Sequence, residues 1–377
     1  MFKRCYFDYN ASVPMVEEAY KVLVDNLNIY GNPSSVHKEG LAAKKILENA
    51  RTKIAKALNI KQHNLVFTSG ASEAATTLLT QHYFIGRSPC FMSHLYIGAT
   101  EHPSILEGGG FNSKNISKIP VLKNGIINYS VLENYLKKHD LSIGLPLVAI
   151  QAANSETGVL QDIESIAKIV HLYKGLLIVD IAQLLGKVVA DLNKMDGDFY
   201  IISAHKLGGP KNIGAFVACS DIIAPQSLIK GSQERGRRGG TQAAALCASF
   251  AVALCKSLEK TPYTNIEQLR NYLESQLYKL VPDIIFYGKE TKRLPNTSFF
   301  RIPNIEAQTL QMALDLEGFA VSAGSACSSG KVNSSHVLQA MGEEEGINAI
   351  RVSLGAIHSK ENIDSFIEKL SIIIKRS

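Results

Sequence analysis

The sequence predicts an α/β fold in which a large, mainly parallel sheet is covered by helices and followed by a smaller α+β domain. Short apolar runs typical of buried strands alternate with segments whose apolar residues recur every three or four positions, as in helices. Continuous apolar strands that alternate with helices are typical of parallel sheets with both faces covered. After about residue 250 this alternation stops, which indicates a second domain.

The expected elements have the following positions. Strands are expected at residues 64–70, 93–102, 146–154, 175–183, 198–206 and 213–219. Helical periodicity covers residues 72–84 and 163–175 between these strands. In the last third, short strands are expected around 296–302 and 347–355, and a helix over 361–375. We therefore assign residues 16–254 to a large domain, and residues 1–15 together with 255–377 to a small one.

Composition and charge indicate an ordinary globular protein that folds on its own. Of the 377 residues, 46% are hydrophobic and 20% are charged, and the net charge is +6. This mild basic excess is spread along the chain and lacks the dense basic face with interleaved aromatic residues that nucleic-acid binding requires. We therefore expect no direct contact with nucleic acid.

The cysteines and the N-terminus indicate a cytoplasmic protein. The 6 cysteines form no C-x-x-C pair and are too sparse for a disulfide scaffold, which fits a reducing compartment. The N-terminal MFKRCYFDYN lacks the apolar segment of a signal peptide, and the chain has no run of about 18 apolar residues. Neither export nor membrane insertion is expected, and no metal-ligand spacing is visible.

Chemically distinctive residues follow the carboxyl ends of the expected strands, where ligands bind in open α/β sheets. The first strand ends in a glycine-containing turn at 68–74 that opens a helix, an arrangement that binds phosphate through free N–H groups and the helix dipole. Later strands end in His102, Asn154, Asp180 and Lys206. One crevice is therefore expected to combine a phosphate-binding turn, an imidazole, an amide, a carboxylate and an amine.

This combination fits pyridoxal phosphate. A lysine forms a Schiff base with an aldehyde, a buried carboxylate keeps a pyridine nitrogen protonated, and a helix N-terminus binds a phosphate. Each group alone has a simpler interpretation: the pair His205-Lys206 as a solvated surface pair, Asp180 as a helix N-cap, and the 68–74 turn as a capped loop. Their placement at successive strand ends favours the cofactor site.

A series of motifs spans nearly the whole chain in the same order as in a known family. These motifs are FDYNAS, YGNPSSVHKEG, FTSGASEA, EHPSI, ANSETG, VDIAQ, SAHKLGGPK, GSQERGRRGGT, RLPNTSF, GSACSSG, SHVLQAMG and IRVSLG. With these motifs the sequence resembles the cysteine desulfurases, pyridoxal-phosphate enzymes of the class V aminotransferase group. The resemblance implies a fold-type I transferase with a mainly parallel seven-stranded sheet. It also implies a homodimer, L-cysteine as substrate, and a sulfur-acceptor protein such as an iron–sulfur scaffold as partner.

The resemblance assigns roles around the cofactor ring. Lys206 would bond to the cofactor aldehyde, and Asp180 would pair with the pyridinium nitrogen. His102 would stack on the ring and take part in proton transfer. Gln183 and Asn154 would lie near the ring hydroxyl, with Asn154 also beside the substrate.

The resemblance also assigns the cofactor phosphate and its contact with a second subunit. Ser72 and the backbone of Ala71, together with Ser203 and His205, would hold the phosphate. Thr241 would reach it from the other subunit, because the cofactor sites of this family lie at the subunit interface.

Arg351 stands in an apolar strand, where a buried guanidinium needs a partner. One interpretation is an internal salt bridge. The other is a bidentate grip on the α-carboxylate of an amino-acid substrate, for which arginine is better suited than lysine. The resemblance favours the second.

Cys327 stands in AGSACSSGK, a segment of small residues that offers a thiol almost nothing to pack against. By the resemblance, its thiolate would attack the sulfur of L-cysteine, which leaves a persulfide on the enzyme and releases alanine. A Gly- and Ser-rich loop gives that thiol freedom to move. Three alternatives remain open: a selenocysteine lyase, another class V enzyme, or a non-catalytic sulfur-transfer scaffold. The other cysteines are expected to be structural.

Overall fold

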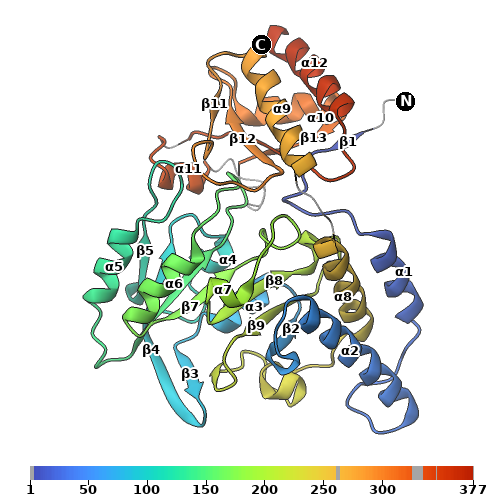
Figure 1. Cartoon of the computed structure of the whole chain (residues 1–377), viewed down its shortest axis with the longest axis vertical. Coiled ribbons are helices and arrows are strands. Elements are labelled where there is room, and N and C mark those ends of the chain that lie inside the picture. Colours follow the sequence, from blue (N-terminus) through green and yellow to red (C-terminus); the bar gives the residue numbers. More distant parts are fainter. Residues whose placement is uncertain (1–3, 260–263, 325–333, 345, 377) are drawn as a thin grey trace.

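The computed structural model describes residues 4–259, 264–324, 334–344 and 346–376, and it consists of a large part and a smaller one (Figure 1). The large part is built on a nine-stranded sheet and the small part on a four-stranded sheet, counted over the described residues. The N-terminal segment runs from the small part into the large part, and after α8 the chain returns to the small part (Figure 1). No helix among the described residues is long and apolar enough to cross a membrane.

The large sheet confirms the predicted α/β fold, but its described part has nine strands instead of the expected seven, and it mixes parallel with antiparallel pairs. Its strands lie in the order β10-β3-β4-β6-β7-β8-β9-β2, and β5 pairs with β4. The pairs from β5 through β4, β6 and β7 to β8 are parallel, whereas β9 and β2 are antiparallel to their neighbours, as are β3 and β10 at the other side. The strands are β2 Leu65–Thr68, β3 His82–Ile85, β4 Ser88–Gly98, β5 Ile116–Ile119, β6 Leu145–Gln151, β7 Leu176–Asp180, β8 Phe199–Ser203, β9 Gly214–Ala218 and β10 Ile223–Pro225.

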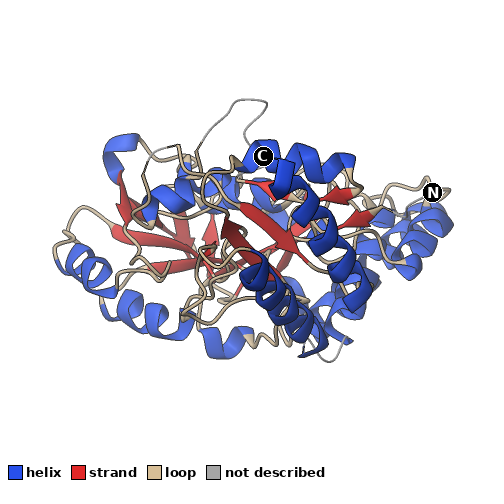
Figure 2. Ribbon diagram, turned by 90° about the horizontal axis from the view of Figure 1, so that it is seen from above, coloured by secondary structure: helices blue, strands red, loops and turns tan. Residues whose placement is uncertain are grey.

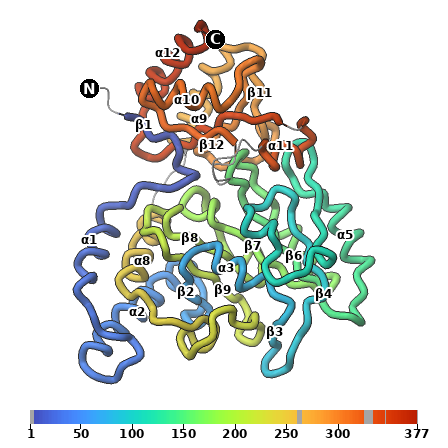
Figure 3. The backbone as a smooth tube through the Cα atoms, turned by 180° about the vertical axis from the view of Figure 1, so that it is seen from behind, coloured from blue at the N-terminus to red at the C-terminus, as the bar shows by residue number. Residues whose placement is uncertain are grey.

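Helices cover both faces of this sheet, as Figure 2 shows with the strands as the middle layer. Alternate residues of β6 enter different cores: Val148 and Ile150 pack on one face, and Leu147 and Ala149 on the other. Figures 1 and 3 show α1, α2 and α8 side by side at one flank. The helices are α1 Glu17–Asn26, α2 Lys38–Ala57, α3 Ala71–Leu78, α4 Pro103–Leu106, α5 Tyr129–Lys137, α6 Ile163–Leu172, α7 Leu192–Met195 and α8 Ala244–Glu259.

One helix predicted in the large part extends too far. Helical periodicity predicted a helix over 72–84, but α3 ends at Leu78 and His82–Ile85 forms β3, which pairs antiparallel with β4. The buried Tyr83 donates its hydroxyl to the carbonyl of Leu78 at 2.6 Å. Cross-strand pairing and this bond to the end of the preceding helix outweigh the local helical pattern.

The small part has its own core and sheet. In the sheet order β11-β12-β15-β14 all neighbours are antiparallel, and β1 pairs in parallel with β13. The expected terminal helix is confirmed as α12. The proposed boundary after residue 254 falls inside α8, and the division into domains stays a prediction. The elements are β1 Cys5–Tyr6, α9 Thr264–Leu280, β11 Ile285–Phe286, β12 Thr297–Arg301, α10 Ala307–Leu316, β13 Phe319–Ala320, β14 Ser322–Ala323, α11 His336–Ala340, β15 Ile350–Ser353 and α12 Lys360–Arg376.

Candidate functional site

A crevice of about 630 Å³ lies at the carboxyl ends of the parallel strands and brings most of the predicted residues together. Both parts of the chain contribute, because β15 and α11 of the small part supply residues to its wall. Asn154 and Thr241 are not among the residues that line it, and Cys327 lies outside the described residues. The predicted residues that line it are Ala71, Ser72, His102, Asp180, Gln183, Ser203, His205, Lys206 and Arg351.

The turn before α3 forms one end of the crevice. Helix geometry leaves the first N–H groups of α3, from Ala71 onward, without partners inside the helix. A Cβ added at Gly70 would meet nothing within 4 Å, so space is open in front of these groups. Gly214 of β9 makes this shape possible, because a Cβ there would lie 2.8 Å from the carbonyl carbon of Gly70. The turn is therefore shaped to receive a small anion.

Lys206 stands immediately after β8, at the end of a short 3-10 turn (Ala204–Lys206). Its Nζ donates to the carbonyl oxygens of Asn10 at 2.6 Å and Ala11 at 3.0 Å. These bonds turn the amine toward the N-terminal segment where that segment crosses the crevice. The lysine therefore reaches the interior of the crevice from the strand end, as the sequence predicted.

Asp180 ends β7, between Gln151 of β6 and Ile201 of β8 in the sheet register. Its Oδ1 accepts the backbone N–H of Ala182 at 2.8 Å. Burial raises the pKa of Asp180, while the bond from Ala182 and the charge of Lys206 act against that rise. A carboxylate held in this way is a strong partner for a buried protonated nitrogen.

His102 is the N-cap of α4 and opens toward the crevice. Its Nδ1 accepts the backbone N–H of Ser104 at 3.2 Å and lies 2.8 Å from the Ser104 hydroxyl. Desolvation, followed by the charges of Lys206 and His336, lowers the pKa of His102 to about 4. The ring is therefore neutral at pH 7 and its orientation is fixed by the α4 turn. His205 also has its pKa lowered to about 4, chiefly by burial.

Asn10 joins the two parts of the chain behind Lys206, and no role was predicted for this residue from the sequence. Its backbone carbonyl accepts Gln183 Nε2 at 2.9 Å as well as Lys206 Nζ. Its Oδ1 accepts Lys187 Nζ at 2.9 Å and Asn296 Nδ2 at 3.1 Å. Lys187 also donates to Gln183 Oε1, so the Gln183 oxygen faces the lysine and its NH₂ group faces Asn10.

Asn154 is buried behind the crevice wall with its side chain fully used. Its Oδ1 accepts the backbone N–H groups of Glu156 at 2.9 Å and Thr157 at 2.8 Å, and its Nδ2 donates to the carbonyl of Thr100 at 3.2 Å. In this conformation the amide shapes the turn after β6. Its role beside a ring hydroxyl or a substrate stays a prediction.

Arg351 forms an internal salt bridge and also lines the crevice, so its position agrees in part with both predicted roles. Its Nη2 pairs with Asp8 Oδ1 at 2.5 Å and its Nη1 donates to the carbonyl of Ser155 at 3.0 Å, so an internal salt bridge exists. Its buried Nε has no hydrogen-bond partner among the described residues, and the side chain lines the crevice. Asp8 thus orients the guanidinium while donor capacity remains for a carboxylate.

Three further ionisable residues of the wall were missed by the sequence reasoning. Burial raises the pKa of Glu101 well above its usual range, and its Oε1 accepts the N–H of Gln151 at 2.9 Å. Glu156, whose pKa is also raised by burial, accepts the Ser335 hydroxyl at 2.5 Å. His336 bonds the carbonyl of Glu101 at 3.0 Å. The motifs EH, NSE and SSH contained these residues, but only the fold shows that they meet.

Thr241 lies at the end of a segment, residues 230–241, that two ion pairs fasten to the large part. Glu234 is paired with Arg51 through contacts of 2.7 and 2.8 Å, and Arg238 is paired with Glu73 of α3 at 2.8 and 3.1 Å. Thr241 itself is exposed. A contact with the phosphate site of a second subunit is compatible with this position and stays a prediction.

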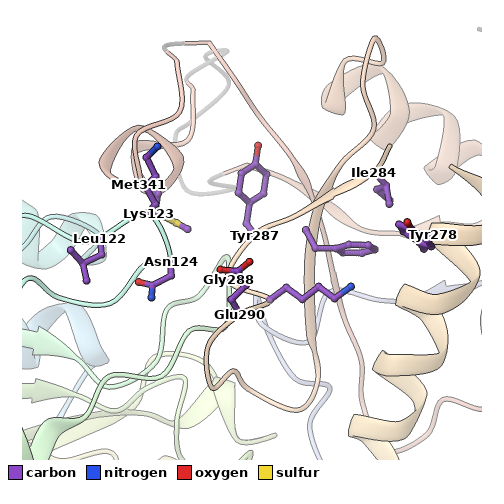
Figure 4. Close-up of a pocket in the computed structure, with 11 residues that line it drawn as sticks. Leu122, Lys123, Asn124, Tyr278, Ile284, Tyr287, Gly288, Glu290 and Met341 are labelled. Carbon is purple, nitrogen blue, oxygen red and sulfur yellow. The ribbon is translucent and has the colours of Figure 1, made fainter. Parts of the chain in front are cut away.

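A shallower pocket of about 500 Å³ lies apart from the crevice, beside β11 (Figure 4). Figure 4 shows Lys123, Asn124 and Met341 on one side, Ile284 on the other and Tyr287 between them. Turns supply four polar residues of its lining, Lys123, Asn124, Lys289 and Glu290. No group of three or more His, Cys, Asp or Glu side chains suited to a metal occurs among the described residues.

Comparison with known proteins identifies the family of this chain. The family model described as aminotransferase class-V matches residues 5–366. The chain belongs to the class-V aminotransferase family. Enzymes of this family typically use pyridoxal phosphate. In this chain Lys206 and Asp180 line the crevice at the strand ends.

Full-length relatives support the predicted resemblance within this family. The chain is 31% identical over 384 residues to cysteine desulfurase IscS of Dictyoglomus turgidum, which covers 100% of this chain and 96% of that protein. It is 31% identical to the cysteine desulfurase of Homo sapiens, over 98% of this chain and 82% of that protein. The solved structure of a NifS-like protein from Rickettsia africae superposes with a TM-score of 0.86 at 31% identity, over 99% of both chains.

The crevice fits pyridoxal phosphate in chemistry and size. The open space in front of the α3 N-terminus suits a phosphate, with Ser72, Ser203 and His205 beside it. The amine of Lys206 and the carboxylate of Asp180 line the same crevice. A cavity of about 630 Å³ is within the range that holds small-molecule ligands.

Proposed function

We propose that this class-V enzyme is a cysteine desulfurase that takes sulfur from L-cysteine, releases L-alanine and passes the sulfur to an acceptor protein. The observation that carries the proposal is that one crevice combines Lys206, Asp180, His102, the α3 N-terminus and Arg351. The relatives named cysteine desulfurase cover the whole chain and support the same activity.

Different side chains of the crevice would bind the cofactor phosphate, the cofactor ring and the substrate carboxylate. The α3 turn, Ser72, Ser203 and His205 would hold the phosphate of pyridoxal phosphate, and Asp180 would hold its ring nitrogen. When bound, this cofactor supplies an electron sink for the α-carbon of an amino acid. Arg351, oriented by Asp8, would bind the substrate carboxylate.

Lys206 and His102 are the proton carriers of the proposed reaction. Both line the crevice, and the depressed pKa of His102 keeps its imidazole neutral and able to accept a proton at pH 7. Lys206 would hold the cofactor at its aldehyde group, and its amine would serve as the base that takes the α-proton of the substrate. Burial raises the pKa of Glu101 well above its usual range, which disfavours a second negative charge beside Asp180.

Cys327 would accept the sulfur. Its thiolate forms a bond to the substrate sulfur, the carbon–sulfur bond of the substrate breaks, and the released electron pair takes up a proton as the fragment becomes alanine. The sulfur stays on Cys327 as a persulfide until an acceptor removes it. The described residues on both sides of its segment are anchored, since Gly324 N–H bonds the Ala349 carbonyl at 3.1 Å and Ser335 N–H bonds Asn348 at 2.9 Å.

The proposed assembly is a cytoplasmic homodimer in which Thr241 of each subunit reaches the phosphate site of the other. The exposed position of Thr241 and the two ion pairs that fix its segment support this arrangement. For the acceptor we propose an iron–sulfur scaffold or a tRNA-thiolation protein. The dimer is tested by sedimentation, and the acceptor by persulfide transfer to purified candidates.

The central test is the variant Cys327→Ala, with Cys255→Ala of α8 as the matched control. We expect Cys327→Ala to lose protein-bound persulfide and alanine formation while the visible absorption of bound cofactor stays. Cys255→Ala should keep all three. Full alanine production by Cys327→Ala would refute the assignment. Faster cleavage of selenocysteine than of cysteine by the unmodified protein would favour a selenocysteine lyase, and failure to bind pyridoxal phosphate would favour a scaffold.

A further inference from the structure

A second cavity, of about 700 Å³, lies behind Lys206 on the opposite side from the crevice. Lys206 lines both cavities and forms part of the wall between them. We call this cavity of about 700 Å³ the rear cavity, and residues of both the large and the small part line it. Its described lining residues are Tyr9, Val13, Gly186, Lys187, Lys206, Leu207, Ser257, Asn265, Ile266, Gln268, Leu269, Tyr272, Asn296, Leu354, Gly355, Ala356, His358 and Lys360.

The rear cavity has an exposed mouth and a buried floor. Asn265, Gln268, Ala356 and Lys360 are exposed and stand at the mouth. Lys187 is buried at the floor, 6% exposed, beside the buried Asn296 and Tyr9. A ligand that enters from the mouth would thus reach the amine of Lys187 only at full depth.

The walls between mouth and floor are largely apolar. Leu207, Ile266, Leu269 and Leu354 supply aliphatic surface, and Tyr272 supplies an aromatic ring. A volume of about 700 Å³ with apolar walls and a few polar groups is typical of sites for small organic molecules. This wall would bind the apolar body of such a ligand.

The described lining of the cavity contains lysines and no acidic residue. The lysines are Lys187, Lys206 and Lys360. Lys187 donates to two amide oxygens, those of Asn10 and Gln183, and takes part in none of the ion pairs found among the described residues. Burial, then the charges of Lys206 and Arg351, lowers the pKa of Lys187 well below its usual value. Burial therefore disfavours the ammonium form of Lys187 in the empty cavity, and a carboxylate bound beside this amine would favour that form.

We propose that the rear cavity is a binding site for a small organic carboxylate with an apolar, ring-containing body, whose carboxylate pairs with Lys187 at the floor. The apolar body lies between Leu269 and Leu354, and Lys360 attracts the anion at the mouth. This site is separate from the crevice and does not depend on the proposed desulfurase activity. Because Lys206 borders both cavities, a ligand in the rear cavity contacts the back of the crevice wall.

The test uses a matched pair of probes on the cofactor-loaded protein. Naphthalene-1-acetate and naphthalene-1-acetamide have the same ring and differ in charge, and isothermal titration calorimetry measures their affinities. We expect the carboxylate to bind about tenfold or more tightly than the amide, since charge-assisted hydrogen bonds are stronger than neutral ones. Equal affinities, or displacement of the carboxylate by L-cysteine, would overturn the proposal.

Two variants separate this site from other anion sites of the protein. Leu269→Trp fills the cavity and should abolish carboxylate binding, whereas Ser275→Trp, on an exposed position of the same helix, should leave it unchanged. Lys187→Met keeps the cavity but removes the amine at its floor, so it should retain amide binding and lose the preference for the carboxylate. If Leu269→Trp fails to fold, Lys187→Met decides alone, and a preserved preference in that variant would overturn the proposal.

Discussion

The replacement Arg51→Met tests whether the buried pair of Arg51 and Glu234 holds the segment that carries Thr241. Arg51 is 6% exposed and donates to Glu234 through two contacts of 2.8 and 2.7 Å, and to the carbonyl of Leu65 at 2.8 Å. Glu234 also accepts the N–H of Phe67 at 3.0 Å. Removing Arg51 leaves a buried carboxylate with only neutral donors.

The expected cost is large because the backbone at this place also needs support. Glu234 and Arg235 have φ angles of 45° and 59°, a left-handed conformation that non-glycine residues adopt at a cost of about 1–3 kcal/mol each. Removing one member of a buried ion pair costs about 3–5 kcal/mol. We expect Arg51→Met to lose about that amount of unfolding free energy, and the 233–236 backbone to relax.

Urea unfolding followed by circular dichroism measures the loss, with Lys61→Met as control. Lys61 pairs with Asp221 on the surface with its side chain 64% exposed, so this control should lose less than about 1 kcal/mol. Hydrogen exchange at Phe67 gives a local measure, because its N–H bonds Glu234. The double variant Arg51→Met with Glu234→Gln should be less destabilised than the sum of the single changes.

A loss in Arg51→Met no greater than in Lys61→Met would refute this reasoning. The same conclusion would follow if exchange at Phe67 stayed as slow as in the unmodified protein. Either result would mean that the 230–241 segment is held by other contacts, such as the pair of Arg238 with Glu73.

Three further predictions concern the crevice and its surroundings. Lys206→Ala should lose the visible absorption of protein-bound pyridoxal phosphate, and a persistent band at the same wavelength would contradict its role. Burial raises the pKa of the Glu101 carboxyl and so disfavours its charge, and Gln keeps the acceptor for the N–H of Gln151, so Glu101→Gln should change cofactor affinity little. Asp180→Asn, in contrast, should weaken cofactor binding at least tenfold, as measured by equilibrium dialysis. Burial lowers the pKa of His358 to about 4 in the folded protein. Between about pH 6.5 and 4 this histidine therefore binds a proton in the unfolded chain but not in the folded one. The free energy of unfolding consequently falls as the pH drops through this window. His358→Gln should flatten this fall in thermal unfolding scans, and an unchanged pH profile would contradict the assignment.

Local pattern was enough to predict β2, β4, β6, β7, β8 and β9 of the large sheet and the placement of the main groups in the crevice, but it did not predict β3, β5 or β10. The apolar run at 146–154 overlaps β6 and the run at 175–183 contains β7, because strands buried on both faces need continuous apolar residues. Asp180 and Lys206 could be placed together, since parallel strands end at one edge of the sheet. The comparison with relatives then confirmed the family that the ordered motifs indicated.

The sequence by itself thus determined the fold class, the family and the residues at the strand ends, because these depend on periodicity and on order along the chain. Only the tertiary structure decided which group each amide contacts. The side chain of Asn154 accepts backbone N–H groups of the turn that follows it, whereas Asn10 accepts hydrogen bonds from Lys206 and Lys187. The tertiary structure also paired Arg351 with Asp8, which lies 343 positions away in the chain. Side-chain orientation, burial and long-range pairing depend on contacts that no local pattern encodes, and these contacts create the rear cavity.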